Sequence, residues 1–368
     1  MINSLFVGGE NMSTSMNQIA AGGAVIQIDN LCKYYQVHQK EAGLIGSLKS
    51  FVNRKYTDVK AVDDVSFQIG AGEIVGFLGP NGAGKTTTLK VLSGLLYPTR
   101  GRVRVLNFTP NERRDSFLRQ ITLVMGQKQQ LNWDLPALET LLVNAAIYEI
   151  PGDQFKRTLG ELTELLELAP LLKKQVRKLS LGERMKCELA AALLHLPHVL
   201  FLDEPTIGLD VTMQTKIRQF VAEYNERHQA TVILTSHYMA DVTALCKRVI
   251  VIDHGKLLYD GDLQALAEKI APHKLIRVEF SRALNGEKLE DYGEVVKTRG
   301  QRAELLVPRD ATSGVAARML AELPIADVTI EEPAIEDVIS RVFEQAAKAR
   351  ADRGETDAED EGEAWGED

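Results

Sequence analysis

The chain has 368 residues, 45% of them hydrophobic and 26% charged, with a formal net charge of −8. Residues 351–368 hold nine acidic residues and one basic residue, which gives −8, so the preceding 350 residues sum to about zero. Residues 1–350 therefore have almost no net charge and an ordinary composition, which argues against a large nucleic-acid-binding surface. The three cysteines are far apart in the sequence and form no C-x-x-C pair, which argues against a disulfide framework or a zinc site.

The first residues are predicted to be a disordered leader over 1–24, because they contain no Lys or Arg and only a short apolar patch. A strand is predicted at 25–28. Between this strand and the next, apolar residues recur at helical spacing, which predicts an inserted amphipathic helix over about 43–56. Basic residues lie beside its apolar stripe. Two interpretations stay open: the helix packs on its own domain, or it lies against a membrane surface or a membrane partner.

Strands alternate with helical segments through the middle of the chain. A helical subdomain is predicted over about 127–190. No stretch reaches the roughly 18 uninterrupted apolar residues expected of a membrane span. The further strands are predicted at 62–69, 74–78, 102–106, 121–125, 199–202, 231–234, 249–253 and 256–259.

A domain boundary is predicted near Ala271 and Pro272, where the pattern changes to short strands with few helices. The domain at 25–270 is then followed by a small α+β accessory domain over 271–347. Residues 348–368 are rich in Glu, Asp and Gly, and are predicted to form an acidic disordered tail.

A phosphate-binding loop lies between the predicted strand at 74–78 and a helix that follows it. Its sequence fits G-x-x-x-x-G-K-[ST]. Glycines let backbone N–H groups surround phosphate oxygens, and the new helix adds its positive end. Lys85 is expected to reach the β and γ phosphates, and the Thr86 hydroxyl to bind Mg²⁺. The loop comprises Gly79, Pro80, Asn81, Gly82, Ala83, Gly84, Lys85, Thr86 and Thr87.

Two adjacent acids, Asp203 and Glu204, end the apolar strand at 199–202. Ligands of open parallel sheets bind at the carboxyl ends of strands. Asp203 is therefore expected in the Mg²⁺ shell, and Glu204 as the base that polarises water. The alternative is an acid pair that is merely solvated.

With these motifs in place, the chain resembles the ATP-binding-cassette (ABC) ATPases from about Val25 to Gly261. Its 179–184 segment is similar to the family's signature loop, and five further motifs occur in family order. The resemblance implies an α/β fold, with a P-loop ABC ATPase domain that combines a mixed sheet core and a helical subdomain. The matching residues are Tyr35, Gln127, Ser180, Gly182, Glu183, Asp210 and His237.

The resemblance also implies a role for each of these residues. Tyr35 would stack on adenine, Gln127 would bind Mg²⁺ and assist catalysis, and His237 would contact the γ phosphate and position Glu204. The remaining residues would bind ATP across a dimer seam: Ser180, Gly182 and Glu183 in the signature loop, and Asp210 in the D-loop. Two ATP sites would then form in a head-to-tail dimer with a second copy or a homologous cassette.

Two positions depart from the family pattern. Leu181 stands at a family glycine, and Glu183 at the usual glutamine. The Glu183 carboxylate could lower ATP affinity, or it could turn away to a neighbouring base such as Arg184.

The function that the resemblance implies is ATP hydrolysis that drives export through a separate polytopic permease. The chain would then lie at the cytoplasmic face of the membrane, held there by the permease. One alternative is the ATPase subunit of an importer, which uses the same motifs. The other is a soluble ABC protein that acts on ribosomes or DNA, although no nucleic-acid partner is expected, because residues 1–350 have almost no net charge.

Overall fold

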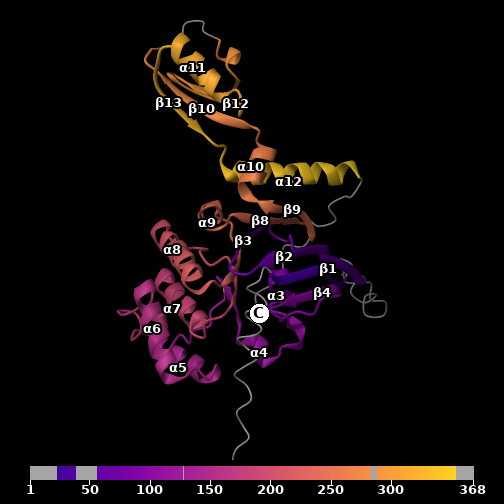
Figure 1. Ribbon diagram of the computed structural model, residues 1–368, viewed down its shortest axis with the longest axis vertical. Coiled ribbons are helices and arrows are strands. Elements are labelled where there is room, and N and C mark those ends of the chain that lie inside the picture. The colour runs from indigo at the N-terminus through magenta and orange to yellow at the C-terminus, as the bar shows by residue number, and fades with distance from the viewer. Residues whose placement is uncertain (1–22, 39–55, 127, 283–287, 354–368) are drawn as a thin grey trace, which may run out of the picture. The chain divides into compact units, whose positions relative to one another are not determined.

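The computed structural model describes residues 23–38, 56–126, 128–282 and 288–353 (Figure 1). The expected leader before residue 23, the inserted segment at 39–55, Gln127 and the tail from residue 354 lie outside the described residues. The chain divides into two compact units, Met1–Asp260 and Gly261–Asp368. Among the described residues, none of the helices combines the length and the hydrophobicity of a transmembrane span.

The first unit contains an antiparallel sheet of three strands in the order β2-β1-β4. These strands are β1 (Ala24–His38), β2 (Tyr56–Gly70) and β4 (Arg100–Val105). The leader was expected to reach residue 24, but Ala24 pairs with Gly70 and begins β1. The inserted helix was predicted to end at about residue 56. Tyr56 instead pairs with His38 and is the first residue of β2, so this end of the prediction is wrong.

The second sheet of this unit has the order β5-β6-β7-β3-β8-β9. Neighbouring strands from β5 to β8 are parallel. All five residues of β6 and of β7 are buried, as expected for parallel strands covered on both faces. The strands are β3 (Ile74–Leu78), β5 (Ile121–Met125), β6 (Val199–Asp203), β7 (Thr231–Thr235), β8 (Arg248–Asp253) and β9 (Lys256–Asp262).

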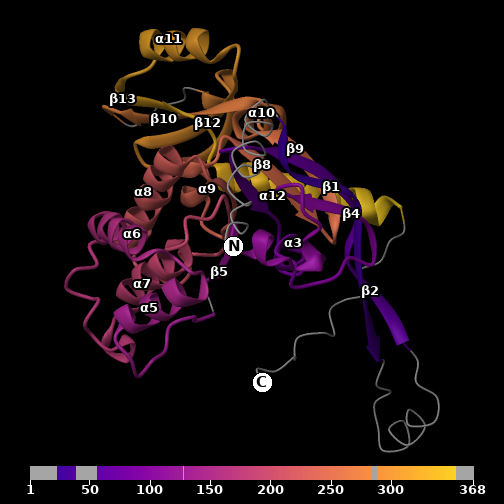
Figure 2. The same ribbon diagram turned by 60° about the horizontal axis from the view of Figure 1, so that its bottom comes forward.

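Helices complete the first unit. Figures 1 and 2 show α5, α6 and α7 grouped on one side of this unit, with the antiparallel sheet on the other side. Because the parallel strands all point the same way, the carboxyl ends of β3, β6 and β7 meet at one edge. The helices are α3 (Lys85–Leu92), α4 (Asp115–Leu118), α5 (Ala137–Ile147), α6 (Gly152–Leu166), α7 (Leu181–Leu193), α8 (Val211–His228) and α9 (Met239–Leu245).

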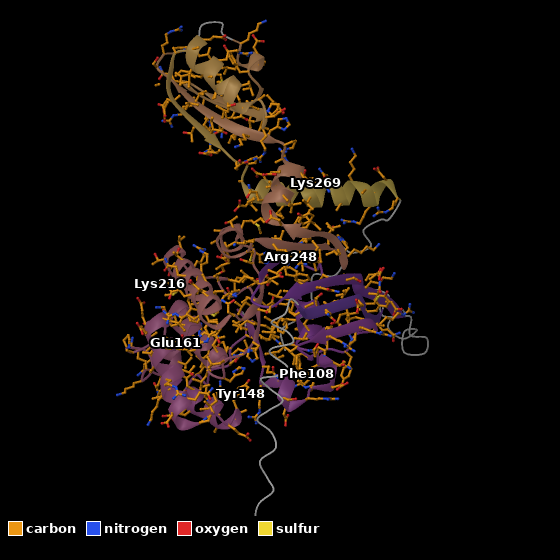
Figure 3. The ribbon with its side chains drawn as sticks, in the orientation of Figure 1. Phe108, Tyr148, Glu161, Lys216, Arg248 and Lys269 are labelled. Atoms are coloured by element: carbon orange, nitrogen blue, oxygen red, sulfur yellow. The ribbon has the colours of Figure 1, made fainter. Side chains whose placement is uncertain are left out.

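Arg248, labelled in Figure 3, is the first residue of β8 and forms hydrogen bonds with residues of neighbouring segments. Its guanidinium donates to Asp260 at 2.8 Å and to Glu73 at 3.1 Å. It also donates to the backbone carbonyl of Gln68 at 2.8 Å. These bonds join β8 to β9, to the turn before β3 and to β2, so they fix the strand that flanks the phosphate-loop strand.

The second unit has an antiparallel sheet in the order β11-β12-β10-β13. Helix α11 (Thr312–Glu322) covers one face, where Ile276, Leu305 and Met319 are fully buried in a common core. Helices α10 (Leu263–Ile270) and α12 (Ile335–Asp352) contact each other. The strands are β10 (His273–Phe280), β11 (Glu294–Arg299), β12 (Arg302–Pro308) and β13 (Ile325–Glu331).

The structure corrects two predicted boundaries in this region. The second unit begins at Gly261 rather than near Ala271, because α10 contacts α12 of that unit. Leu263 and Leu266 of α10 are buried. The predicted disordered tail was placed from residue 348, but α12 continues to Asp352.

Candidate active site

The phosphate-binding loop joins β3 to α3, as its sequence requires. Gly82 and Gly84 have φ angles of 79° and 100°, which lie in the left-handed region that favours glycine. A Cβ atom on Gly84 would lie 2.2 Å from the carbonyl oxygen of Ala61. The loop therefore needs glycine at residue 84 both for its turn and for its close approach to β2.

Lys85 lies at the first position of α3 and is buried. Its Nζ donates to the carbonyl oxygens of Gly79 at 2.6 Å and Pro80 at 2.9 Å. Burial lowers the pKa of Lys85, while the nearby charges of Glu204 and Asp203 oppose this shift. The ammonium group is thus held inside the loop by weak neutral acceptors, which an anionic phosphate could replace.

Asp203, the last residue of β6, receives two hydroxyl hydrogen bonds. Thr86 at the start of α3 donates to its Oδ2 at 2.8 Å, and Thr235 at the end of β7 donates to its Oδ1 at 2.7 Å. Asp203 is only 8% exposed. The hydroxyl and carboxylate oxygens that meet here are hard donors, which fit Mg²⁺.

Glu204 follows with φ = 54°, an uncommon angle for a residue other than glycine. Its backbone N–H donates to both the carbonyl and the hydroxyl oxygen of Thr235, at 3.1 Å each. Its Oε1 lies 2.6 Å from Nε2 of His237, and the two side chains are 17% and 43% exposed. The structure thus brings Lys85, the Thr86–Asp203 pair and the Glu204–His237 pair to one edge of the sheet.

Ser180 caps the N-terminus of α7 in a reciprocal capping box with Glu183. The Ser180 hydroxyl accepts from the Glu183 N–H at 3.2 Å, and the Glu183 carboxylate accepts from the Ser180 N–H at 2.9 Å. The Ser180 hydrogen bond is the main reason why the pKa of Glu183 is lowered, and Lys174, 3.5 Å away, adds to this shift.

Glu183 therefore turns back onto its own helix end and towards Lys174. The expected turn towards a neighbouring base is found, but the base is Lys174 and not Arg184, which was offered as an example. The Arg184 guanidinium instead lies 5.1 Å from the centroid of the Trp133 ring. Gly182 packs tightly, since a Cβ atom there would lie 2.7 Å from the Met213 side chain.

Two further predicted residues, Asp210 and Tyr35, make local contacts. The Asp210 carboxylate accepts from the Met213 N–H at 2.9 Å and so caps α8. Tyr35 is half-buried on β1, with the Lys33 ammonium 5.1 Å from its ring. Among the interactions of the described residues, none joins Tyr35, Ser180 or Asp210 to the phosphate loop.

Gln127 lies outside the described residues, but the chain on each side of it is anchored. The Gly126 N–H donates to the carbonyl oxygen of Asp203 at 2.8 Å. On the other side, the Glu188 carboxylate accepts from the N–H groups of Gln130 at 3.0 Å and Leu131 at 3.2 Å. Sequence reasoning missed Glu188, although an acid among the apolar residues of a predicted buried helix is a detectable signal.

Taken together, this strand, loop and helix, followed by an acid pair at the end of a parallel strand, define a phosphate-loop nucleotide hydrolase. Models of two families match the chain: "ABC transporter" over residues 62–207, and "EvrA-like ABC transporter, C-terminal domain" over residues 272–331. Each model corresponds to a different one of the two units.

Known proteins agree with these family matches. The chain is 34% identical to the ABC transporter ATP-binding protein NatA of Bacillus subtilis, over 64% of this chain and 96% of NatA. It is 31% identical to the doxorubicin resistance ATP-binding protein DrrA of Mycobacterium tuberculosis, over 76% of this chain and 87% of DrrA. A solved dimeric, post-hydrolysis ATP-binding cassette with ADP and phosphate aligns with a TM-score of 0.53 at 26% identity, covering 64% and 98% of the two chains.

The chain therefore belongs to the ATP-binding proteins of ABC transporters. It is an ATP-binding subunit with the P-loop ABC ATPase fold, and it hydrolyses ATP. The fold class predicted from the sequence is confirmed.

Proposed function

We propose that this subunit drives export of a substrate through a separate membrane permease, with ATP hydrolysed by the residues gathered at the sheet edge. The observation that carries the hydrolytic part is the 2.6 Å approach of Glu204 Oε1 and His237 Nε2 beside the phosphate loop. A carboxylate in this place can polarise water for attack on the γ phosphate. His237 orients that carboxylate and offers a hydrogen bond to the phosphate.

ATP binding in this proposal uses the loop at 79–87. Lys85 exchanges its carbonyl acceptors for β and γ phosphate oxygens. Thr86, Asp203 and Gln127 would hold Mg²⁺, and the oxygen donors that meet at Thr86 and Asp203 fit that ion. When bound, the ion would neutralise developing negative charge on the phosphates. Tyr35 stacks on the adenine ring.

We further infer that two cassettes form a head-to-tail dimer. The solved cassette described above is dimeric in a post-hydrolysis state. Ser180, Gly182 and Glu183 lie at the N-terminus of α7, and the positive end of the helix dipole there favours an anion. In the dimer this helix end, together with Asp210, would face the nucleotide of the other subunit.

An exposed apolar surface supports the presence of a membrane partner. Apolar side chains that are 43–65% exposed occur in the loop after Gln127 and on α5. Exposed apolar side chains that lie near one another in the chain are candidates for a protein interface. The chain would then be peripheral at the cytoplasmic face of the membrane. The surface comprises Trp133, Leu135, Leu142, Val143 and Ile147.

The direction of transport is inferred from relatives. Matched proteins are described as bacitracin transport, linearmycin resistance and Nod factor export ATP-binding proteins. Names of this kind favour export over import.

We expect the neighbouring gene to encode a polytopic membrane protein. The experiment is co-purification in detergent with that protein, followed by ATPase assays with and without it. We expect a stable complex whose ATPase activity depends on Glu204. In inside-out vesicles, ATP should drive a substrate inward for an exporter. Transport in the opposite direction would indicate an importer, and co-migration with ribosomes or DNA without membranes would overturn the proposal.

A further inference from the structure

A buried carboxylate, Asp241, is hydrogen-bonded to residues that lie close to Glu204 and His237 in the chain. Asp241 is in the first turn of α9 and is 1% exposed. Its Oδ2 accepts from the Thr206 hydroxyl at 2.5 Å and from the Ser236 hydroxyl at 2.7 Å. Its Oδ1 accepts from Nη1 of Arg218 at 2.7 Å. A buried acid is costly unless it is paired and hydrogen-bonded, and all of these requirements are met here.

The two hydroxyl donors belong to the chain segments that carry the catalytic pair. Thr206 is two residues after Glu204, and Ser236 is immediately before His237. The Ser236 hydroxyl oxygen also accepts from the Tyr238 N–H at 3.0 Å, so it holds the backbone on the far side of His237. The Oδ2 atom of Asp241 thus fixes the distance between the segment that carries Glu204 and the segment that carries His237.

The third donor brings in a further helix. Arg218 lies on α8, whose N-terminus is capped by Asp210. Its Nη2 also donates to Thr215 at 2.9 Å on the same helix. The Arg218–Asp241 ion pair is largely buried, with side-chain exposures of 15% and 1%. If α8 shifted, Arg218 would therefore move the Asp241 carboxylate, and with it the segments that carry Glu204 and His237.

We propose that Asp241 is a positioning residue for ATP hydrolysis, which holds Glu204 and His237 at their working separation and connects them to α8. The inference rests on the roles proposed above for Glu204 and His237. Among the described residues, the hydrogen-bond partners of the Asp241 carboxylate are Thr206, Ser236 and Arg218, and none of these is a proposed ATP-binding residue. The loss of Asp241 should therefore affect turnover rather than ATP binding. Misplacement of a catalytic group by about 1 Å can cost on the order of 10²-fold in rate.

The test measures steady-state ATP hydrolysis of the full-length chain at saturating and limiting MgATP. We expect Asp241→Asn to lower kcat on the order of 10- to 100-fold, with KM for ATP within about threefold. Thr206→Val removes one hydroxyl at nearly constant volume and should lower kcat as well. Thr206→Ser keeps the hydroxyl and should restore most of the rate.

A matched control is Glu161→Gln. Glu161 of α6, labelled in Figure 3, contacts the other end of α8, where His228 lies 3.1 Å away and Arg227 3.6 Å away. This variant removes a carboxylate against the same helix and should retain kcat. If Asp241→Asn does not fold, the kcat values of Thr206→Val and Thr206→Ser are compared instead. The positioning role requires a lower kcat in Thr206→Val than in Thr206→Ser.

Two failures can be told apart with Glu204→Gln. If this variant still hydrolyses ATP, the proposed site is wrong. If it is inactive while Asp241→Asn or Thr206→Val keeps kcat within twofold, the positioning role is wrong. An increase in KM at constant kcat, or an equal loss of kcat in Glu161→Gln, would also overturn the inference.

Discussion

The Thr86 hydroxyl donates a hydrogen bond to Asp203 over 2.8 Å, although 117 residues separate them in the chain. The hydroxyl comes from the first turn of α3 and the carboxylate from the end of β6. Two oxygen atoms that suit Mg²⁺ are therefore already paired before any ligand is considered. Next to them in the chain, the Lys85 ammonium group donates hydrogen bonds to two carbonyl oxygens of its own loop.

Lys85→Met should weaken ATP binding. Hydrogen bonds to charged groups are worth about 1.5–3 kcal/mol, so the affinity should fall by roughly 10- to 100-fold. Titration with a fluorescent ATP analogue measures this loss. The control is Lys90→Met, which changes the basic residue in the last turn of the same helix. Binding by Lys85→Met within twofold of the original protein would contradict the assignment.

Glu183→Gln should leave the fold intact and change ATP turnover by less than Glu204→Gln does. Glutamine can keep the capping box, since its side chain also accepts from the Ser180 N–H. Glu183→Ala cannot, and should lower the free energy of unfolding by about 0.5–1.5 kcal/mol, the net value of one hydrogen bond. Denaturant unfolding and ATPase assays measure both effects. Equal losses of turnover in Glu183→Gln and Glu204→Gln would refute the ranking.

Glu167 should make stability depend on acidic pH. Its hydrogen bonds to Lys186 at 2.8 Å and Lys216 at 2.7 Å lower its pKa from 4.5 to about 2 (Lys216 is labelled in Figure 3). Because the folded pKa is the lower one, this stabilisation is complete above pH 4.5 and is lost as the pH falls towards 2.

The variant Glu167→Gln removes this titration. Its free energy of unfolding should therefore change less steeply between pH 4.5 and 2 than that of the original protein. Denaturant titrations at several pH values measure the slope. Identical slopes would show that the two lysines do not perturb Glu167 in solution.

Glu188→Ala should release the loop that follows Gln127. The N–H groups of Gln130 and Leu131 lose their acceptor, so their hydrogen exchange should accelerate by about tenfold or more. Trypsin cleavage after the exposed Lys128 should accelerate as well. Glu161→Ala is the control, because it removes an acid elsewhere in the same helical group. Unchanged exchange at both amides would mean that other contacts hold the loop.

Elements that carry a strong local sequence signal were predictable. The strands at 74–78 and 199–202 match β3 and β6 to within one residue, because their apolar runs and flanking glycines or acids are local signals. The hairpin between β8 and β9 was predictable from His254 and Gly255, both of which have positive φ angles. Even so, α10 was placed in the wrong unit, since the partner that covers it, α12, lies far along the chain.

Within the site, the sequence pointed to chemically distinctive residues and missed those that hold them. The motifs identified Glu204 and His237, whose 2.6 Å contact the structure shows. Asp241 carries no motif, because its role depends on donors from three different segments. For Glu183 the sequence left two alternatives open, and Arg184 was only an example of the base it could contact. In the structure its carboxylate accepts from the Ser180 N–H at its own helix end and lies 3.5 Å from Lys174, a base from outside the helix.

By itself the sequence determined the phosphate loop, the acid pair and the order of the motifs, because glycine conformation and strand burial act over a few residues. Only the tertiary structure decided which side chains meet. Thr86 meets Asp203, Glu204 meets His237, and Asp241 accepts hydrogen bonds from side chains of three separate segments. Such contacts depend on how strands are ordered in the sheet. That order follows from the burial of the whole core, which no local pattern encodes.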